Sequence, residues 1–202
     1  MSVELEISGA EPLTTELIDR VDRARARAED DGMLVVRLGS GSVEWPGKVD
    51  VHLVGKWEQA LRKLERVPAT TIAIASGGCA GAAAELLLVT DYRLAAPGFR
   101  LHLHPWPGMA LYRLVVQAGA ARARRLALFG GELDASEAAS LGLIDEIADN
   151  PDAAITELKT LAGKEIAIRR RLMLDAGSMQ FEEALGAHLA ACDRYLRAGE
   201  AE

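Results

Sequence analysis

Residues 70–91 read Thr-Thr-Ile-Ala-Ile-Ala-Ser-Gly-Gly-Cys-Ala-Gly-Ala-Ala-Ala-Glu-Leu-Leu-Leu-Val-Thr-Asp, and this stretch decides the fold. Its β-branched start predicts a buried strand over 70–75. A turn of small residues follows over 76–84, and an apolar helix over 85–89 comes after it. Because the first turn of a helix has free N–H groups and a partial positive charge, this arrangement can stabilise an oxyanion. A phosphate-binding turn would look similar, but the lysine and hydroxyl of a Walker loop are absent.

Strands and helices alternate around this stretch up to about residue 95. Strands are expected over 3–7, 33–38, 92–96, 100–104 and 143–147, and helices over 15–29, 51–66, 109–118, 120–129, 135–141, 152–176 and 180–197. The nearly continuous apolar run 33–38 is typical of a parallel sheet covered on both faces. The sequence therefore predicts an α/β core over 1–130 and a helical C-terminal region over 131–202.

The segment Thr71–Asp91 resembles the signature of the crotonase (enoyl-CoA hydratase/isomerase) superfamily. In that family a strand ends in a glycine-rich turn, a helix carries a catalytic acid, and an aspartate closes the helix six residues later. Glu85 and Asp91 have this separation. The resemblance implies an α/β, ClpP-like crotonase fold of stacked ββα units with a C-terminal helical trimerisation region. It also implies an acyl-CoA substrate, with coenzyme A as part of that substrate and no further cofactor.

Two downstream segments extend the resemblance to about residues 33–147. Pro107-Gly108, followed by Arg113-Leu114, is similar to the family's Pro-Gly…Arg-Leu helix. The segment 129–147 is similar to its Leu-Thr-Gly…Gly-Leu-Val stretch.

The chain is also similar to one specialised branch of the family. Lys56-Trp57-Glu58 and the run 106–110 carry this similarity, as do the segment 167–173 and the Phe181-Glu182 pair that follows it. This branch is the B-type homologue of the 3,5-dihydroxyphenylacetyl-CoA pathway, which supplies dihydroxyphenylglycine to glycopeptide antibiotics. The resemblance implies a type III polyketide synthase as a partner.

The resemblance also implies where the thioester carbonyl binds. The family holds it with two backbone N–H groups, one of which maps to Ala82. The second maps to the loop after the second core strand, where Pro46 has no N–H to donate. Gly47 is therefore the expected donor, with Lys48 as the alternative. Trp45, Lys48 and Trp106 are the expected substrate-binding side chains.

Glu85 is the expected acid or base, although a carboxylate near a helix start can simply favour the helix dipole. Hydratases of the family use a second carboxylate about twenty residues later, and the segment 99–107 contains none. His102 and His104 titrate near neutral pH and share one face of a strand, so they are the candidate replacements. The alternative is a pair of structural histidines. Asp91 and Asp145 are expected to be structural.

Composition excludes several classes of protein. With a net charge of −7, a duplex-DNA binder is not expected. Basic clusters at Arg122, Arg124 and Arg125 and at 169–171 are expected on solvated helix faces, or else against CoA phosphates or a partner subunit. Without a secretory signal or a membrane-spanning run, the protein is expected in the cytoplasm, with Cys79 and Cys192 as buried free thiols.

Three hypotheses of function remain from the sequence. The first is an enoyl-CoA hydratase-like dehydratase or isomerase assisting the synthase. The second is a non-catalytic accessory protein that binds and stimulates the synthase, which the proline at position 46 and the missing second acid favour. The third is another CoA-thioester hydrolase or decarboxylase on the same fold. Apolar stripes over 152–197, together with the family resemblance, indicate a homotrimer or hexamer.

Overall fold

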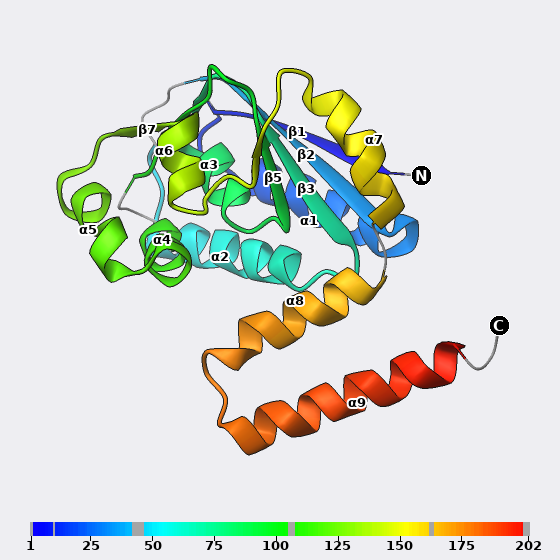
Figure 1. Ribbon diagram of the computed structural model, residues 1–202. Helices are drawn as coiled ribbons and strands as arrows, with labels where there is room; N and C mark the ends of the chain where they lie inside the picture. Colours follow the sequence, from blue (N-terminus) through cyan, green and yellow to red (C-terminus); the bar gives the residue numbers. More distant parts are fainter. Residues whose placement is uncertain (1, 10, 42–46, 105–107, 162–163, 200–202) are drawn as a thin grey trace.

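The computed structural model describes residues 2–9, 11–41, 47–104, 108–161 and 164–199. Its centre is a parallel sheet with the strand order β1-β2-β3-β5-β8 (Figure 1). These strands are β1 (Val3–Ser8), β2 (Met33–Gly39), β3 (Thr70–Ala75), β5 (Tyr92–Ala95) and β8 (Glu146–Ile147). Every residue of β3 is buried, which confirms the expected sheet with both faces covered.

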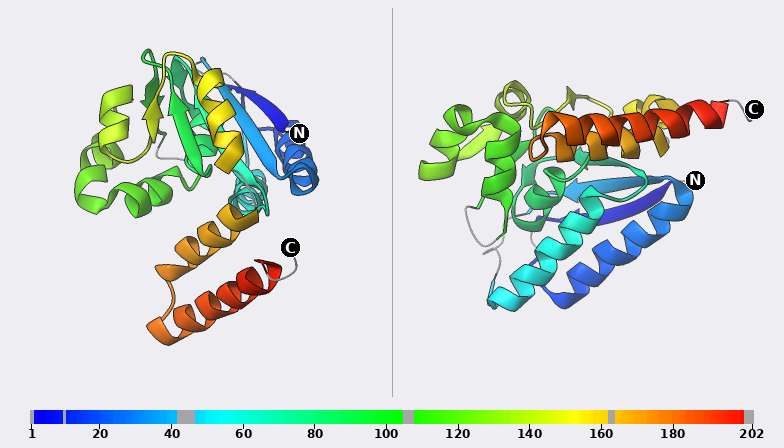
Figure 2. Two further views of the ribbon diagram at one scale, coloured as in Figure 1. Left: turned by 45° about the vertical axis from the view of Figure 1, so that its right-hand side comes forward. Right: turned by 90° about the horizontal axis from the view of Figure 1, so that it is seen from below.

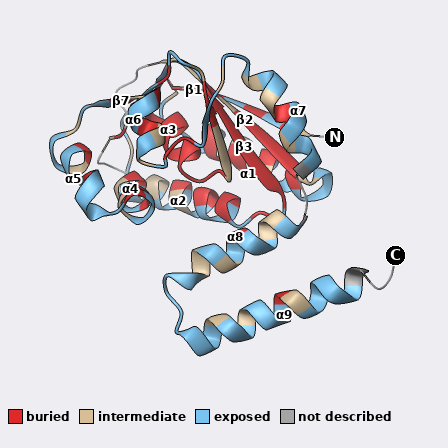
Figure 3. Ribbon diagram, viewed as in Figure 1, coloured by how far each residue is buried: buried red, intermediate tan, exposed pale blue. Residues whose placement is uncertain are grey.

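Helices cover the two faces of this sheet (Figure 2). On one face lie α1 (Thr15–Asp31), α2 (Val51–Glu65) and α3 (Gly81–Leu87), which share the main core with the sheet. On the other face α7 (Pro151–Leu161) packs its Ile155 against alternate residues of the strands, namely Met33, Val35, Ile72, Ile74 and Leu94. Buried residues thus form one cluster on each side of the sheet, and β2 and β3 are coloured mostly as buried in Figure 3.

Short polar residues cap two of the core helices. The hydroxyl of Thr14 accepts a hydrogen bond from Leu17 N–H at 3.1 Å at the start of α1. The carboxylate of Asp50 accepts one from Leu53 N–H at 2.7 Å at the start of α2. This second cap fixes where α2 begins after the loop that contains Gly47.

A second, smaller sheet has the order β4-β6-β7 and was not expected. It consists of β4 (Gly78–Cys79), β6 (Arg100–His102) and β7 (Glu132–Asp134). Strands of two or three residues are too short to show an alternating pattern, so sequence reading missed β4 and β7. The helices α4 (Ala110–Ala118), α5 (Ala120–Phe129) and α6 (Ala135–Ser140) lie around this sheet.

Two of the expected helices differ from the structure. The helix expected over 85–89 begins at Gly81, because the alanines after it are strong helix formers, so Glu85 lies inside α3 and not at its start. The single helix expected over 152–176 is two helices, α7 and α8 (Lys164–Ala176). Gly163 falls between them in the sequence, and glycine is a poor helix former.

The C-terminal helices α8 and α9 (Phe181–Gly199) form a hairpin that extends from the body of the molecule (Figures 1 and 2). A buried arginine anchors it. Arg170 donates to Asp91 Oδ2 at 2.6 Å, to the carbonyl of Ala69 at 3.2 Å and to the carbonyl of Val67. The expectation that Arg170 lies on a solvated face was therefore wrong, because an arginine at this depth needs acceptors for its charge.

The other arginines of the two basic clusters lie on solvated helix faces, as expected. Arg169 and Arg171 are exposed and pair with acids one turn away, and the three arginines of α5 are exposed.

Cys79 is buried, and burial raises the pKa of its thiol to about 12. Cys192 is only partly buried, so the expectation of a buried thiol was wrong there. Within the described ranges, no helix is long and apolar enough to cross a membrane.

Replacing the buried anchor should destabilise the fold. In Arg170→Ala, the carboxylate of Asp91 keeps its burial but loses its counter-ion, so we expect the free energy of unfolding to fall by about 3–5 kcal/mol. The control is Arg169→Ala, whose arginine is 74% exposed and pairs with Glu165. There we expect a change of less than about 1 kcal/mol. Urea denaturation of both variants measures the difference, and equal midpoints would contradict the anchoring role.

Candidate functional site

The candidate site lies at the edge of the main sheet where its parallel strands end. The segments that follow β2, β3 and β5 all leave from this edge, because parallel strands share one direction. The segment after β2 carries Gly47, and the segment after β3 leads into α3 with Ala82 and Glu85. The segment after β5 leads to β6 with His102. The topology therefore brings the predicted site segments to one end of the sheet.

Small residues shape the turn that leads into α3. Gly81 has a φ of +55°, a conformation that residues with a side chain rarely adopt. Ala82 follows in the first turn of the helix, where N–H groups have no intrahelical acceptor. Glu85 lies one turn later, and helical side chains lean toward the N-terminal end of their helix. The Cα–Cβ bond of Glu85 therefore leans toward the turn that contains Ala82.

Glu85 is held within the protein, with an exposed fraction of only 2%. The indole N–H of Trp57 on α2 donates to Glu85 Oε2 at 2.5 Å. Gly108 lies against the same carboxylate, since a Cβ on Gly108 would lie 2.1 Å from Oε1 and 2.3 Å from Oε2. No side chain fits at position 108 unless Glu85 moves.

Sequence reading missed Trp57 and Gly108 as neighbours of Glu85. Trp57 lies on the buried face of α2, and its side chain is fully buried. A buried indole N–H usually finds an acceptor, and that requirement was the available signal. Gly108 had been noted only within a Pro-Gly pair, and nothing in the sequence gives its distance from Glu85.

His102 and His104 lie close together, although the strand on which both were expected ends at His102. Their ring centroids are 4.7 Å apart in an edge-to-face arrangement. His102 ends β6, and His104 contributes to the wall of a small hollow between this segment and the helices α4 and α5. The other lining residues are Leu103, Leu111, Leu114, Leu126 and Ala127. Burial and the nearby charge of His102 both lower the pKa of His104, which favours its neutral form near pH 7.

The remaining predicted site residues are placed as follows. Gly47 has a φ of +82° and lies exposed before the cap of α2, with Lys48 exposed beside it. Trp45, Pro46 and Trp106 lie outside the described residues. The roles predicted for Gly47 and Lys48 in binding the substrate stay predictions.

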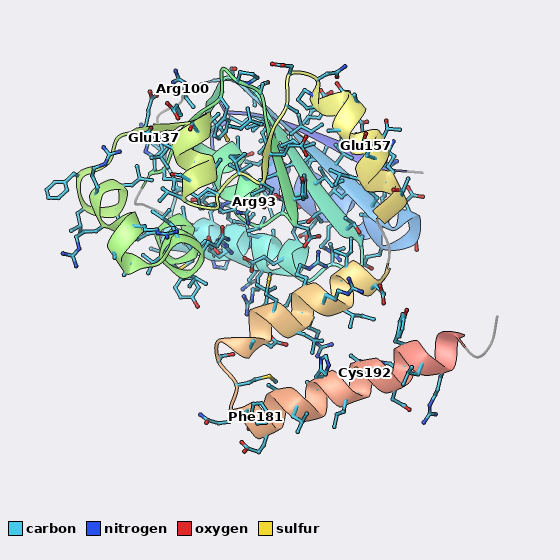
Figure 4. The ribbon with its side chains drawn as sticks, in the orientation of Figure 1. Arg93, Arg100, Glu137, Glu157, Phe181 and Cys192 are labelled. Atoms are coloured by element: carbon cyan, nitrogen blue, oxygen red, sulfur yellow. The ribbon has the colours of Figure 1, made fainter. Side chains whose placement is uncertain are left out.

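Asp91 and Asp145 stabilise the backbone, as predicted for structural residues. Asp91 Oδ2 accepts from the N–H of Thr71 at 2.8 Å and from its hydroxyl at 2.9 Å. Asp145 Oδ2 accepts from Arg93 N–H at 2.9 Å. These bonds lie at the start of β5 and hold it between β3 on one side and the segment before β8 on the other; Arg93, labelled in Figure 4, belongs to β5.

Comparison with known proteins gives the family. A family model described as enoyl-CoA hydratase/isomerase matches residues 48–193. An enoyl-CoA-hydratase of Amycolatopsis orientalis is 45% identical over 206 residues, covering 96% of this chain and 95% of the relative. The chain therefore belongs to the enoyl-CoA hydratase/isomerase family.

Other relatives are more distant. A mitochondrial Δ(3,5)-Δ(2,4)-dienoyl-CoA isomerase of Dictyostelium discoideum is 25% identical over 138 residues, and the matched region spans 65% of this chain and 47% of the isomerase.

Solved structures confirm the crotonase fold. A Thermobifida fusca YX protein, described as an enoyl-CoA hydratase in complex with CoA, matches 99% of this chain and 92% of its own length with a TM-score of 0.79 and 19% identity. An enoyl-CoA hydratase/isomerase from Marinobacter aquaeolei matches 98% of this chain and 88% of its own length with a TM-score of 0.75 and 18% identity. The expected α/β architecture with C-terminal helices is thereby confirmed.

The lowered pKa of His104 can be measured directly. We expect the ring of His104 to titrate with a midpoint below its ordinary value of 6.5, because burial and the positive charge of His102 disfavour its protonated form. His102→Asn removes the second cause and should raise the midpoint partway. Histidine ring resonances followed by NMR between pH 4 and 9 give both values, and a midpoint above 6.5 in the parent protein would contradict the burial seen here.

Proposed function

We propose that the protein removes the α-proton of an acyl-CoA thioester with Glu85 and catalyses loss of water from a β-hydroxy thioester. The observation that carries this proposal is the buried Glu85 carboxylate, oriented by Trp57 one turn after Ala82. Family membership supports a CoA thioester as the substrate, as does the CoA complex of the Thermobifida relative. The reaction needs no cofactor beyond the CoA of the substrate.

The proposed reaction uses one carboxylate twice. Glu85 takes the α-proton, and the electron pair moves into the thioester, whose oxygen the N–H groups of Ala82 and Gly47 stabilise. The enolate then expels the β-hydroxyl, which takes the proton from Glu85 and leaves as water. When Glu85 returns its own proton, the carboxylate is regenerated and the atoms balance without a second acid.

We further propose that the product belongs to 3,5-dihydroxyphenylacetyl-CoA formation beside a type III polyketide synthase. Loss of water from a cyclised polyketide gives an aromatic ring, and aromaticity lowers the barrier to elimination. A site with one carboxylate suits this easier dehydration better than the hydration of an isolated double bond. The sequence resemblance at Lys56-Trp57-Glu58 supports the assignment to this pathway.

A second candidate is a non-catalytic accessory protein that stimulates the synthase. It is favoured by the segment 99–104, which contains no carboxylate in the place where hydratases of the family have their second acid. The two candidates differ in what they require of Glu85. Only the enzyme needs its proton transfer, whereas an accessory protein needs only its fold.

Replacing Glu85 separates the two candidates. In Glu85→Gln the amide keeps the shape and accepts from Trp57 but cannot take a proton, so we expect kcat to fall by about 10²–10⁴-fold. Two assays measure this: α-proton exchange of 3-hydroxybutyryl-CoA in D₂O, and aromatic product formed by the synthase from malonyl-CoA with and without this protein. The matched control is Glu132→Gln on β7. Undiminished stimulation of the synthase by the Glu85 variant would favour the accessory role.

We propose that the protein is a homotrimer or a hexamer assembled through the α8–α9 hairpin. Most of this hairpin is exposed in a single chain (Figure 3). Its exposed apolar side chains include Met173, Phe181, Leu185, Leu189, Tyr195 and Leu196. Phe181, labelled in Figure 4, lies at the start of α9. Apolar surface of this extent usually marks an interface.

Light scattering tests the assembly. We expect a mass three or six times the 21.6 kDa of one chain. Leu189→Glu should lower that mass, because a charge would be buried in the interface, while Arg194→Glu on the same helix should lower it less. A parent protein that scatters as a monomer would overturn the proposed assembly.

A further inference from the structure

Two adjacent residues of α2 contact the two sides of the candidate site. Trp57 donates its indole N–H to the Glu85 carboxylate at 2.5 Å. The next residue, Glu58, accepts the backbone N–H of Met109 at 2.7 Å through Oε1. Helix α2 therefore holds both the catalytic candidate and the segment that leads into α4.

That segment touches Glu85 directly. Gly108 precedes Met109, and a Cβ built on Gly108 would lie 2.1 Å from Glu85 Oε1. A shift of the Gly108 backbone would therefore change the space around the carboxylate. The hydrogen bond from Met109 N–H to Glu58 holds the backbone one residue after Gly108, next to the contact between Gly108 and Glu85.

Glu58 is itself held in place by a buried arginine. Arg113 on α4 donates to Glu58 Oε1 at 3.2 Å and lies 3.1 Å from its Oε2. The same arginine donates to Glu65 Oε1 at 2.9 Å, and the Arg113 side chain is only 7% exposed. Two carboxylates of α2 thus bind one cation of α4, but only Glu58 also binds the backbone beside Gly108.

We propose that Glu58 is a positioning residue, which fixes the Gly108–Met109 backbone against the Glu85 carboxylate. Its oxygens are engaged by Arg113 and by Met109 N–H, so it acts as a fixed acceptor and not as the missing second acid. This inference rests on the proposed role of Glu85. It adds that α2 sets the geometry of proton transfer through two consecutive residues.

The expected effect falls on turnover more than on binding. A displacement of about 1 Å in a reacting group can lower the rate by about 10²-fold, so Glu58→Ala should reduce kcat by that order while KM changes little. Glu58→Gln retains an oxygen that can accept from Met109 N–H, so it should restore much of kcat. This rescue also guards against a general loss of folding.

Glu65→Ala is the matched control. It removes an acceptor from the same arginine on the same helix, but Glu65 has no bond to Met109. Amide hydrogen exchange reports the geometry without any reaction. The Met109 amide should exchange faster in Glu58→Ala and at the parent rate in Glu65→Ala.

The test combines this exchange with the kinetics of 3-hydroxybutyryl-CoA α-proton exchange. Faster Met109 exchange and lower kcat in Glu58→Ala alone support the inference. Equal losses in the Glu58 and Glu65 variants would overturn it, because they would indicate only loss of an ion pair. Full kcat in Glu85→Gln would refute the proposed function, whereas full kcat in Glu58→Ala, with Glu85→Gln inactive, would refute positioning alone.

Discussion

The arrangement of the molecule follows from a carboxylate placed inside an apolar helix. Glu85 lies among alanines and leucines on α3, and a buried carboxylate is stable only where donors meet it. Trp57 provides such a donor from α2. Helix α2 must therefore pack where its buried face meets α3, and that packing also closes the main core over β2 and β3. The need of a buried carboxyl group for a hydrogen-bond donor thus becomes a requirement on helix placement.

The far end of α3 has a similar constraint, met by different residues. Asp91 comes shortly after the helix and binds Thr71 of β3 and Arg170 of α8 at once. The helix that carries Glu85 is thereby linked to the C-terminal hairpin, which exposes the apolar surface proposed for assembly. Interactions at one end of α3 orient the candidate acid, and those at the other end place the hairpin. The site and the assembly surface share this short helix.

Local pattern predicted most of the fold, while contacts between distant segments were not predictable. The run 70–75 and the helix containing Trp57 were correct, because buried strands and amphipathic helices show their periodicity locally. Strands β4 and β7 were missed because two or three residues carry no periodicity. The proximity of His102 and His104 was expected from strand geometry, although β6 ends at His102. The approach of Gly108 to Glu85 depends on how α4 docks on α2, which a single sequence does not encode in any short pattern.

The lack of a carboxylate at 99–104 has an electrostatic consequence. Two carboxylates close together raise each other's pKa, which keeps one of them protonated and ready to donate. His104 lies in the segment that contains no carboxylate, and burial and the nearby His102 lower its pKa, which favours the neutral imidazole near pH 7. An imidazole with a lowered pKa is a poorer substitute for a protonated second acid, so in the proposed reaction Glu85 has to return the proton itself.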